Sequence, residues 1–376
     1  MRTMLRRCVI ILAFAFVIVV ATALRIVPAR AEESRSNPAF NLLIKLALPT
    51  QISVDTLTVS GNYVYLGWHP FGYGNPPGGF GIVSIEDPSS CKLAWSSKGL
   101  PYPTSICVVD NIAYVAFITR NKRGPEGRLE TFDVTNPIMP KPLGGLDLDG
   151  PAEELTDFVP ICMDVANGCV FLGMQGGMNI VDAGDPSVLR LLKTYLTLGF
   201  KIPQSEWMGV SDICVDGARA YLAGRGLRVL DITDLSSPKP IGSYIFAGDA
   251  QSVTVQDGKA YLVVFEYAPG PEGTHELESA RLDIVDVADA SNLRLLQGIN
   301  LSKDTRSVVL GNGVVYLVSD DDLTVNRIDG VKPSFSNDKL VIPCCNGGGF
   351  KVFDVSVPTS PRLLGTYLIE GDSQQP

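Results

Sequence analysis

The feature that most constrains the fold of this chain is an internal repeat, which is clearest at Gly209–Ala247. Each unit contains a short apolar strand, a tight turn and a second strand, then a third strand ending in Leu-Asp or a close variant, and a fourth strand after a turn. The same order recurs from Ser105 and from Ser252. Three further copies cover residues 53–97, 160–196 and 305–369, so we count six. Such self-similarity predicts a repeat architecture in which neighbouring units bury a shared core.

Each copy has the chemistry of short antiparallel strands. Alternating Val, Ile and Tyr suit half-buried strands, and the pairs Gly61-Asn62, Asn167-Gly168 and Asp257-Gly258 supply positive φ for tight hairpins. The 37 Gly and 26 Pro make turns frequent, which favours many short strands over long helices. Four antiparallel strands per unit, with no helix between units, predict an all-β fold: a β-propeller whose closed ring protects the sheet edges.

An aspartate ends the third strand in most copies, and Ser84 fills this place in the first copy. The aspartates are Asp133, Asp182, Asp231, Asp286 and Asp354. A repeated carboxylate could serve catalysis or metal binding. Its position at a strand end, directly before a turn, instead favours a side chain that accepts hydrogen bonds from the backbone N–H groups of that turn.

The third-strand sequences LDIVDVADA, MNIVDAGDP and LRVLDITDLSSP resemble the LVIVD-repeat family of bacterial and archaeal cell-surface proteins. The resemblance covers about residues 41–370. It implies a β-propeller and an extracytoplasmic location. It implies no reaction, because the family is not defined by one.

The number of blades is less constrained than the fold. We favour six four-stranded blades, the last one carrying extra strand-like sequence at 323–329 and 339–343, and seven blades remain open. Residues 42–48 have the pattern of a fourth strand with no first three strands before it. We therefore expect Leu42–Leu48 to pair with the blade that contains Phe350–Val355 and Pro361–Ile369, because an open seam would expose sheet edges.

The first 31 residues have the features of an export signal: a basic start, the apolar run Cys8–Leu24 and the small-x-small sequence Ala29–Ala31. The run is nearly long enough to span a bilayer, so an uncleaved anchor is the alternative. The expected organisation is a signal (1–31), a linker (32–40), the propeller (41–370) and a tail (371–376). We expect an extracytoplasmic protein: secreted, periplasmic or at the cell surface.

Charge and cysteine content narrow the partners. Cleavage would remove five of 31 basic residues and none of 40 acidic ones, so 26 basic residues remain and the net charge is −14. Nucleic acid and anionic lipid would repel such a domain, so we expect no nucleic-acid partner and membrane contact only through an uncleaved N-terminal segment. The cysteines form no metal-binding pattern. We expect most of them to pack as buried thiols, and Cys162 with Cys169 could form one disulfide across a hairpin.

Long connections should gather on one face of the disc, because strand direction alternates within a blade. Five long loops, at 68–79, 119–127, 147–159, 197–210 and 266–280, fall on that face. Loop insertions on one face of a rigid scaffold commonly mark a working surface, and unselected drift is the alternative. The candidate ligand-binding residues are Trp68, His69, Phe71, Tyr73, Trp207, Tyr267 and His275, with Phe200 nearby. Such groups suit a protein or glycan partner, unless the aromatic rings only cover blade ends.

Acidic residues occur where the chain enters the first strand of a blade, at Asp157, Asp212, Asp249 and Asp304. In a propeller these positions approach the central channel, where carboxylates could hold Ca²⁺; solvated loop acids are the alternative. The sequence requires no cofactor, and none of the common hydrolase, metalloprotease or nucleotide-binding motifs occurs in it. We expect a binding module rather than an enzyme. The alternatives are a metal-dependent propeller hydrolase or lactonase with its site at the channel mouth, and a purely structural envelope component.

Overall fold

The computed structural model describes most of the repeat region and two short N-terminal strands. The described residues are 26–28, 41–44, 52–70, 78–87, 91–97, 99–121, 124–148, 160–174, 176–197, 209–269, 275–301, 305–311, 314–319, 334–336, 339–343, 349–354 and 362–369. They form 28 strands. No helix in this part of the chain has the length and hydropathy needed to cross a bilayer.

Five antiparallel sheets each contain four strands that follow one another in the sequence. Blade 1 contains β3 (Ile52–Ser60), β4 (Tyr63–Pro70), β5 (Gly79–Ser84) and β6 (Lys92–Ser96). Blade 2 contains β7 (Tyr102–Val109), β8 (Ile112–Asn121), β9 (Gly124–Asp133) and β10 (Lys141–Leu148). Blade 3 contains β11 (Pro160–Ala166), β12 (Cys169–Met174), β13 (Gly177–Asp182) and β14 (Arg190–Leu196). Blade 4 contains β15 (Asp212–Asp216), β16 (Arg219–Gly224), β17 (Gly226–Asp231) and β18 (Lys239–Tyr244). Blade 5 contains β19 (Asp249–Gln256), β20 (Lys259–Pro269), β21 (His275–Asp286) and β22 (Arg294–Leu301).

Two further sheets occupy the remaining part of the ring. One contains β23 (Thr305–Gly311) and β24 (Val314–Ser319), with β1 (Ile26–Pro28) parallel to β24. The other contains β25 (Ser334–Ser336), β26 (Lys339–Pro343), β27 (Gly349–Asp354) and β28 (Arg362–Ile369), with β2 (Asn41–Ile44) at its outer edge.

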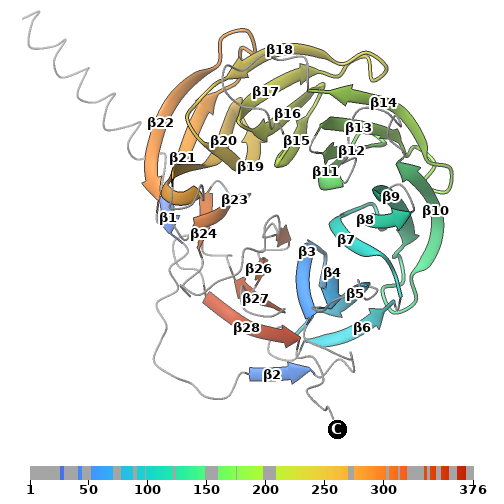
Figure 1. The fold of residues 1–376 in the computed structure, drawn as a ribbon. Helices are drawn as coiled ribbons and strands as arrows, with labels where there is room; N and C mark the ends of the chain where they lie inside the picture. The colour runs from blue at the N-terminus through green and yellow to red at the C-terminus, as the bar shows by residue number, and fades with distance from the viewer. Residues whose placement is uncertain are drawn as a thin grey trace, which may run out of the picture.

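The sheets surround a central axis and the ring closes (Figure 1). The first strand of each blade lies innermost and contacts the first strand of the next blade, from β3 through to β19 and on to β23. β25 then contacts both β23 and β3, which completes the circle. The protein is therefore a β-propeller, and the predicted blade of four antiparallel strands is confirmed.

Residues 305–369 differ from the single decorated copy that the sequence suggested. They contribute six strands to two separate sheets, because six strands exceed the four that one blade accommodates. The described strands thus form seven sheets. Five consist of the four strands of a blade, a sixth has four such strands, β25–β28, together with β2, and the seventh has β23 and β24 with β1. The choice between six and seven blades stays a prediction.

The N-terminal strands join the end of the chain. Leu42, Leu43 and Ile44 pair in parallel with β28, in the blade predicted to receive them, and residues 45–48 lie outside the described residues. β28 is already the fourth strand, so β2 is a fifth strand on the outer edge, while the ring closes through β25 and β3. β1 lies within the expected signal segment, so cleavage after Ala31 would remove it from its sheet.

Apolar side chains fill the spaces between consecutive blades. Phe80 and Ile82 of blade 1 pack with Val115 and Phe117 of blade 2, and comparable clusters join blades 2 to 3, 3 to 4 and 4 to 5. The middle strands of the blades are buried along nearly their whole length, as in β12, where all six residues are buried. Such continuous burial is expected for sheets covered on both faces by neighbours. These four clusters each span two blades, and a further cluster is formed by residues of blade 5. Packing between neighbours therefore stabilises the blades jointly.

The turn chemistry predicted from the sequence is confirmed. Asp133, Asp182, Asp231 and Asp286 each accept a hydrogen bond from the backbone N–H two residues later, at 2.9 to 3.2 Å. Ser84 accepts the corresponding bond at 3.4 Å. The side chain of Asp354 lies outside the described residues. Both residues of Asn167-Gly168 and Asp257-Gly258 have positive φ, whereas in Gly61-Asn62 only the glycine does.

The proposed disulfide is wrong for a geometric reason. In the hairpin of β11 and β12, Cys162 lies opposite Gly173 and Cys169 lies opposite Ala166, so the two cysteines are not cross-strand partners. Both thiols are buried in the core between blades 3 and 4. This is the packing role expected for most of the cysteines.

Candidate binding face

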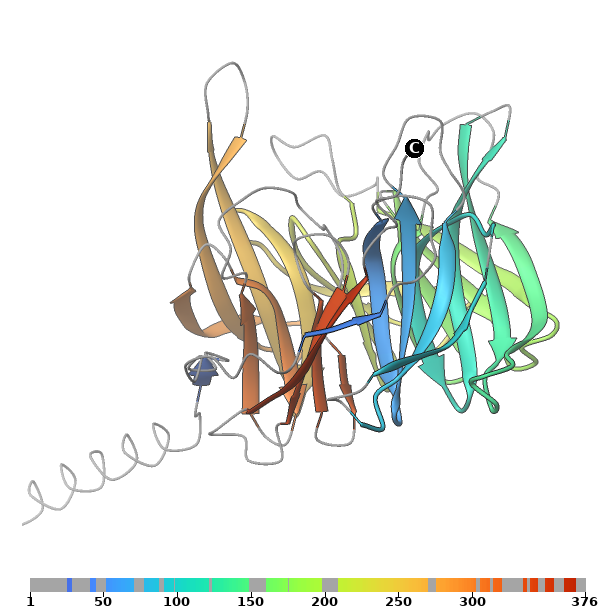
Figure 2. The same cartoon turned by 90° about the horizontal axis from the view of Figure 1, so that it is seen from below.

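Two extended hairpins rise on the same side of the disc, the β8–β9 hairpin of blade 2 and the β20–β21 hairpin of blade 5 (Figure 2). Their paired strands continue to Asn121–Gly124 and to Pro269–His275. The corresponding pairing in blades 3 and 4 already ends at Met174–Gly177 and Gly224–Gly226. We call the side from which the two hairpins rise the long-loop face.

One strand position separates the long hairpins from the short ones. Five residues before the turn aspartate, the short hairpins have Gly177 and Gly226, with φ of 154° and 131°. L-residues with a side chain rarely adopt such a φ, so the tight connection requires glycine. In the long hairpins the same position lies in mid-strand and is occupied by Arg128 and Arg281.

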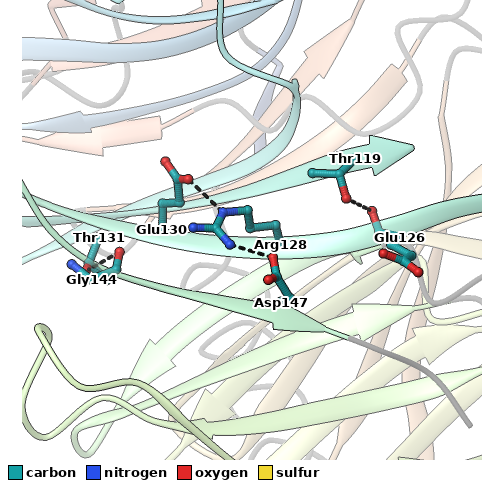
Figure 3. Close-up of polar contacts among 7 residues, drawn as sticks. All are labelled: Thr119, Glu126, Arg128, Glu130, Thr131, Gly144 and Asp147. Atoms are coloured by element: carbon teal, nitrogen blue, oxygen red, sulfur yellow. Dashed lines mark hydrogen bonds and ion pairs between the residues drawn. The ribbon is translucent and has the colours of Figure 1, made fainter. Parts of the chain in front are cut away.

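Arg128 fixes the base of the β8–β9 hairpin (Figure 3). Its Nε donates to Glu130 Oε1 at 2.8 Å, and its Nη1 donates to Asp147 Oδ1 on β10. Hydrogen bonds to these two carboxylates, first to Glu130, raise the pKa of Arg128. A Cβ on Gly145 would stand 2.6 Å from Arg128 Nη2, so the glycine leaves room for the guanidinium group. Nearer the tip of the hairpin, Thr119 Oγ1 donates to the carbonyl oxygen of Glu126 at 3.2 Å.

Arg281 has the equivalent role in the β20–β21 hairpin. Its Nε donates to Asp283 Oδ1 at 3.0 Å, its Nη1 donates to Glu266 Oε1, and its Nη2 donates to the Ala247 carbonyl at 3.1 Å. Its guanidinium carbon also lies 5.8 Å from the ring centre of Phe246. The hairpin is thereby tied to the segment that connects blades 4 and 5.

Asp283 is the most unusual residue of this cluster. Its side chain is 1% exposed, and its Oδ2 has no hydrogen-bond partner among the residues that the structure describes. Burial raises the pKa of this carboxyl group, against the opposing effect of Arg281. By contrast, the pKa of Glu266 is lowered, first by the hydrogen bond from Ser279 and then by Arg281. The shared pattern Arg-Leu-acid, at Arg128–Glu130 and Arg281–Asp283, is visible in the sequence and was missed there.

The aromatic residues predicted to bind a ligand differ in how far they are buried. Trp68 is buried at 3% exposure, and its ring packs so closely over Gly79 and Gly81 that a Cβ on either would overlap it. It is therefore not an exposed recognition residue, and this part of the prediction is wrong. Tyr267, at the base of the β20–β21 extension, is half-buried, with its ring edge-on to Phe265 at 6.4 Å.

The other candidates cannot be placed by their side chains. His69 is in β4 and His275 is in β21, opposite Pro269, but their side chains lie outside the described residues. Four further candidates lie entirely outside the described residues, namely the aromatic residues Phe71, Tyr73, Phe200 and Trp207. Their part in ligand binding stays a prediction.

The two described acids among the channel candidates have protein partners. Asp212 is fully buried, and its carboxylate accepts the N–H of Ile213 at 2.7 Å and that of Val253, in blade 5, at 2.8 Å. Asp249 forms an ion pair with Arg225 at 3.2 Å. Asp157 and Asp304 lie outside the described residues. Within the described part, no group of three or more potential metal ligands is found. Asp212 is thus a structural link between blades, which corrects its candidacy as a metal ligand.

A shallow pocket opens at the β16–β17 turn of blade 4. Its lining includes Val210, Leu222, Arg225, Arg228 and several glycines. Burial lowers the pKa of Arg228, while Tyr195 of blade 3 opposes that effect. The interior of the pocket has room for about one water molecule, whereas sites that enclose small substrates usually measure roughly 300–1,000 Å³.

Comparison with known proteins agrees with this architecture. The LVIVD repeat matches at residues 53–97, 209–245 and 345–369, which lie in blade 1, in blade 4 and in the β25–β28 sheet. The chain carries LVIVD repeats. No curated protein matches the sequence.

Solved structures show likeness at the level of the fold. A computationally designed protein, Ika8, is 14% identical, with a TM-score of 0.51 over 86% of this chain and 89% of that chain. The WD40 domain of Neurospora crassa Pan2 is 9% identical, with a TM-score of 0.47 over 87% of this chain and 81% of that one. BamB from Moraxella catarrhalis is 12% identical, with a TM-score of 0.40 over 87% and 75%. At such identities the likeness concerns the fold alone.

Proposed function

We propose that this LVIVD-repeat propeller is an exported binding module, which holds a protein or glycan of the cell envelope on its long-loop face. The observation that carries the proposal is the pair of extended hairpins on that face, each fixed at its base by an arginine between carboxylates. In blades 3 and 4 the position of these arginines is occupied by Gly177 and Gly226, which allow a tight connection between the second and third strands.

Rigid bases make these hairpins suited to recognition. An ordered hairpin loses little conformational entropy when a partner binds, so more of the contact energy appears as affinity. Arg281 links the β20–β21 hairpin to the Ala247 carbonyl and to Glu266, and Arg128 links the β8–β9 hairpin to β10. The hairpins therefore present the groups beyond their bases from a fixed platform.

Shortened hairpins test the proposal. In one variant Asn-Gly replaces residues 119–126 and joins Ile118 to Gly127; in the other it replaces residues 267–278 and joins Glu266 to Ser279. Both changes keep the arginine clusters and use a pair that favours a two-residue hairpin turn. The control substitutes serine for Ile138 and Met139, which are 64% and 59% exposed in a turn on the opposite face.

The measurement is photo-crosslinking in envelope preparations, followed by comparison of the captured species across the three proteins. We expect the wild type and the Ile138/Met139 control to capture the same species, and the doubly shortened protein to lose it while unfolding at a similar temperature. Equal capture by the doubly shortened protein would show that the partner binds elsewhere.

Export is tested separately. The support for it is the N-terminal sequence, with its basic start, its apolar run and Ala29–Ala31. Expression of the full chain in a bacterial host should give an exported product whose mass corresponds to a chain beginning at Glu32. A product that retains Met1 and sediments with membranes would support the uncleaved anchor instead, and a product confined to the cytoplasm would refute export.

A further inference from the structure

The outermost strands of blade 3 and of the β25–β28 sheet are nearly identical in sequence. β14 is Arg190–Leu196, RLLKTYL, and the first seven residues of β28 are RLLGTYL. These seven residues differ at one position, where β14 has Lys193 and β28 has Gly365. They also have equivalent places, since each is the fourth strand of its blade and pairs with the strand that ends in the turn aspartate.

β28 binds an additional strand. β2 runs parallel to it along the outer edge, and Asn41, Leu42, Leu43 and Ile44 lie opposite Thr366 to Ile369 (Figure 1). The equivalent positions on β14 are residues 194–197, which begin with the same Thr-Tyr-Leu. The edge of β14 therefore offers nearly the same surface on which β2 is bound.

The edge of β14 also lacks the proline found on its neighbours. It is the last strand of its sheet in the described part of the chain, and Leu191, Leu192 and Leu196 are each 40% exposed. At the register position of Leu191, β10 and β18 have Pro142 and Pro240. Proline on an edge strand removes a backbone donor and discourages the addition of another strand.

We propose that the outer edge of β14 is a strand-addition site for a partner protein. The chain's own segment is not the occupant, because its attachment to the same molecule gives it a high effective concentration at β28. The occupant is a short strand parallel to β14 that carries uncharged residues of the Asn-Leu-Leu-Ile type. Directly before them it carries an acidic residue, opposite Lys193, because opposite charges in a cross-strand pair attract.

The probe is a fluorescent peptide of residues 39–46 with blocked ends, titrated into the mature protein. Two versions carry N-methyl groups on alternate amides, one at Leu42 and Ile44 and the other at Leu43 and Lys45. In a β-ladder only alternate residues of the added strand face the edge. One version should therefore lose about tenfold or more in affinity through two missing hydrogen bonds, while the other keeps it. Equal effects of both versions, or no saturable binding, would overturn the proposal.

Combining a charge change in the peptide with one in the protein identifies which strand edge binds the peptide. A peptide with Phe40→Asp should bind the wild type about two- to fivefold more tightly than the native peptide. Lys193→Gly, which copies the β28 sequence, should abolish this gain while leaving the native peptide bound. An unchanged gain in the Lys193→Gly protein would mean that the peptide displaces β2 from β28, which overturns the assignment to β14. Concentration-dependent dimerisation of the mature protein that the peptide reverses would make a second copy the occupant and equally overturn it.

Discussion

Two aspartates on the third strands of neighbouring blades differ in the direction of their pKa shifts. Asp231 of blade 4 is partly exposed, and its pKa is lowered, first by the hydrogen bond from the Thr233 side chain and then by that from the Thr233 N–H. Asp283 of blade 5 is buried, and its pKa is raised by that burial. The first carboxylate stabilises the fold when it is charged, and the second is stabilising when it is protonated.

Replacement of the turn aspartate tests the first of these effects. Asp231→Ala should lower the melting temperature at pH 7, because the N–H of Thr233 loses its acceptor. The folded pKa is depressed, so the stabilisation is present above the unfolded value of about 3.9 and is lost as the pH falls through the folded pKa. The difference from the wild type should therefore shrink in thermal unfolding at about pH 3. Asp231→Asn is the control and should retain most of the stability, since Asn136 accepts a comparable turn bond.

Replacement of the buried aspartate should have the opposite pH dependence. Because the folded pKa of Asp283 is raised, its ionised form is penalised above that pKa, and the penalty disappears as the pH falls through it. The melting temperature of Asp283→Asn relative to the wild type should thus be more favourable at pH 7 than at pH 4. A difference that is constant with pH, in unfolding curves measured across this range, would show that Asp283 titrates normally.

At the scale of the strand and its turn, glycine decides how far a hairpin projects. Gly226 has a φ of 131°, and a Cβ there would stand 3.2 Å from the Tyr244 carbonyl oxygen. Gly226→Ala should destabilise the protein by about 1–3 kcal/mol, the typical cost of a strained backbone conformation. The matched control is Arg225→Ala in the same turn, which removes only an exposed ion pair. Equal midpoints for the two variants in denaturant unfolding would contradict this role of the glycine.

Much of this element-level structure could be predicted from the sequence, because its causes are local. The turn aspartates and the Asn-Gly and Asp-Gly pairs act within a few residues of themselves. The burial of Trp68 depends instead on Gly79 across the hairpin, and the links of Arg281 involve residues that are distant in the sequence. The division of residues 305–369 into two sheets depends on which blade each strand contacts, and strand pattern alone does not carry that information.

At the scale of the whole ring, polar bonds accompany the apolar contacts between blades. Thr56 Oγ1 accepts the N–H of Ile106 at 3.1 Å, Asp164 Oδ2 accepts that of Val215 at 2.7 Å, and Asp212 Oδ2 accepts that of Val253 at 2.8 Å. Each bond joins the innermost strand of one blade to the innermost strand of the next. These bonds form a polar belt that joins the inner strands of blades 1 and 2 and those of blades 3, 4 and 5, which supports cooperative unfolding of the joined blades.

Asp212 offers the sharpest test of this belt, because its carboxylate is fully buried and serves two blades. Asp212→Ala leaves the N–H groups of Ile213 and Val253 without their acceptor, and hydrogen bonds to charged groups are worth about 1.5–3 kcal/mol each. We expect the free energy of unfolding to fall by about 3–6 kcal/mol on that basis, while denaturant unfolding remains a single transition. Asp249→Ala is the control: its ion pair with Arg225 is partly exposed, so its loss should cost well under half as much. A second transition in Asp212→Ala, detected by a probe confined to blade 5, would show that the blades unfold independently and that the belt does not couple them.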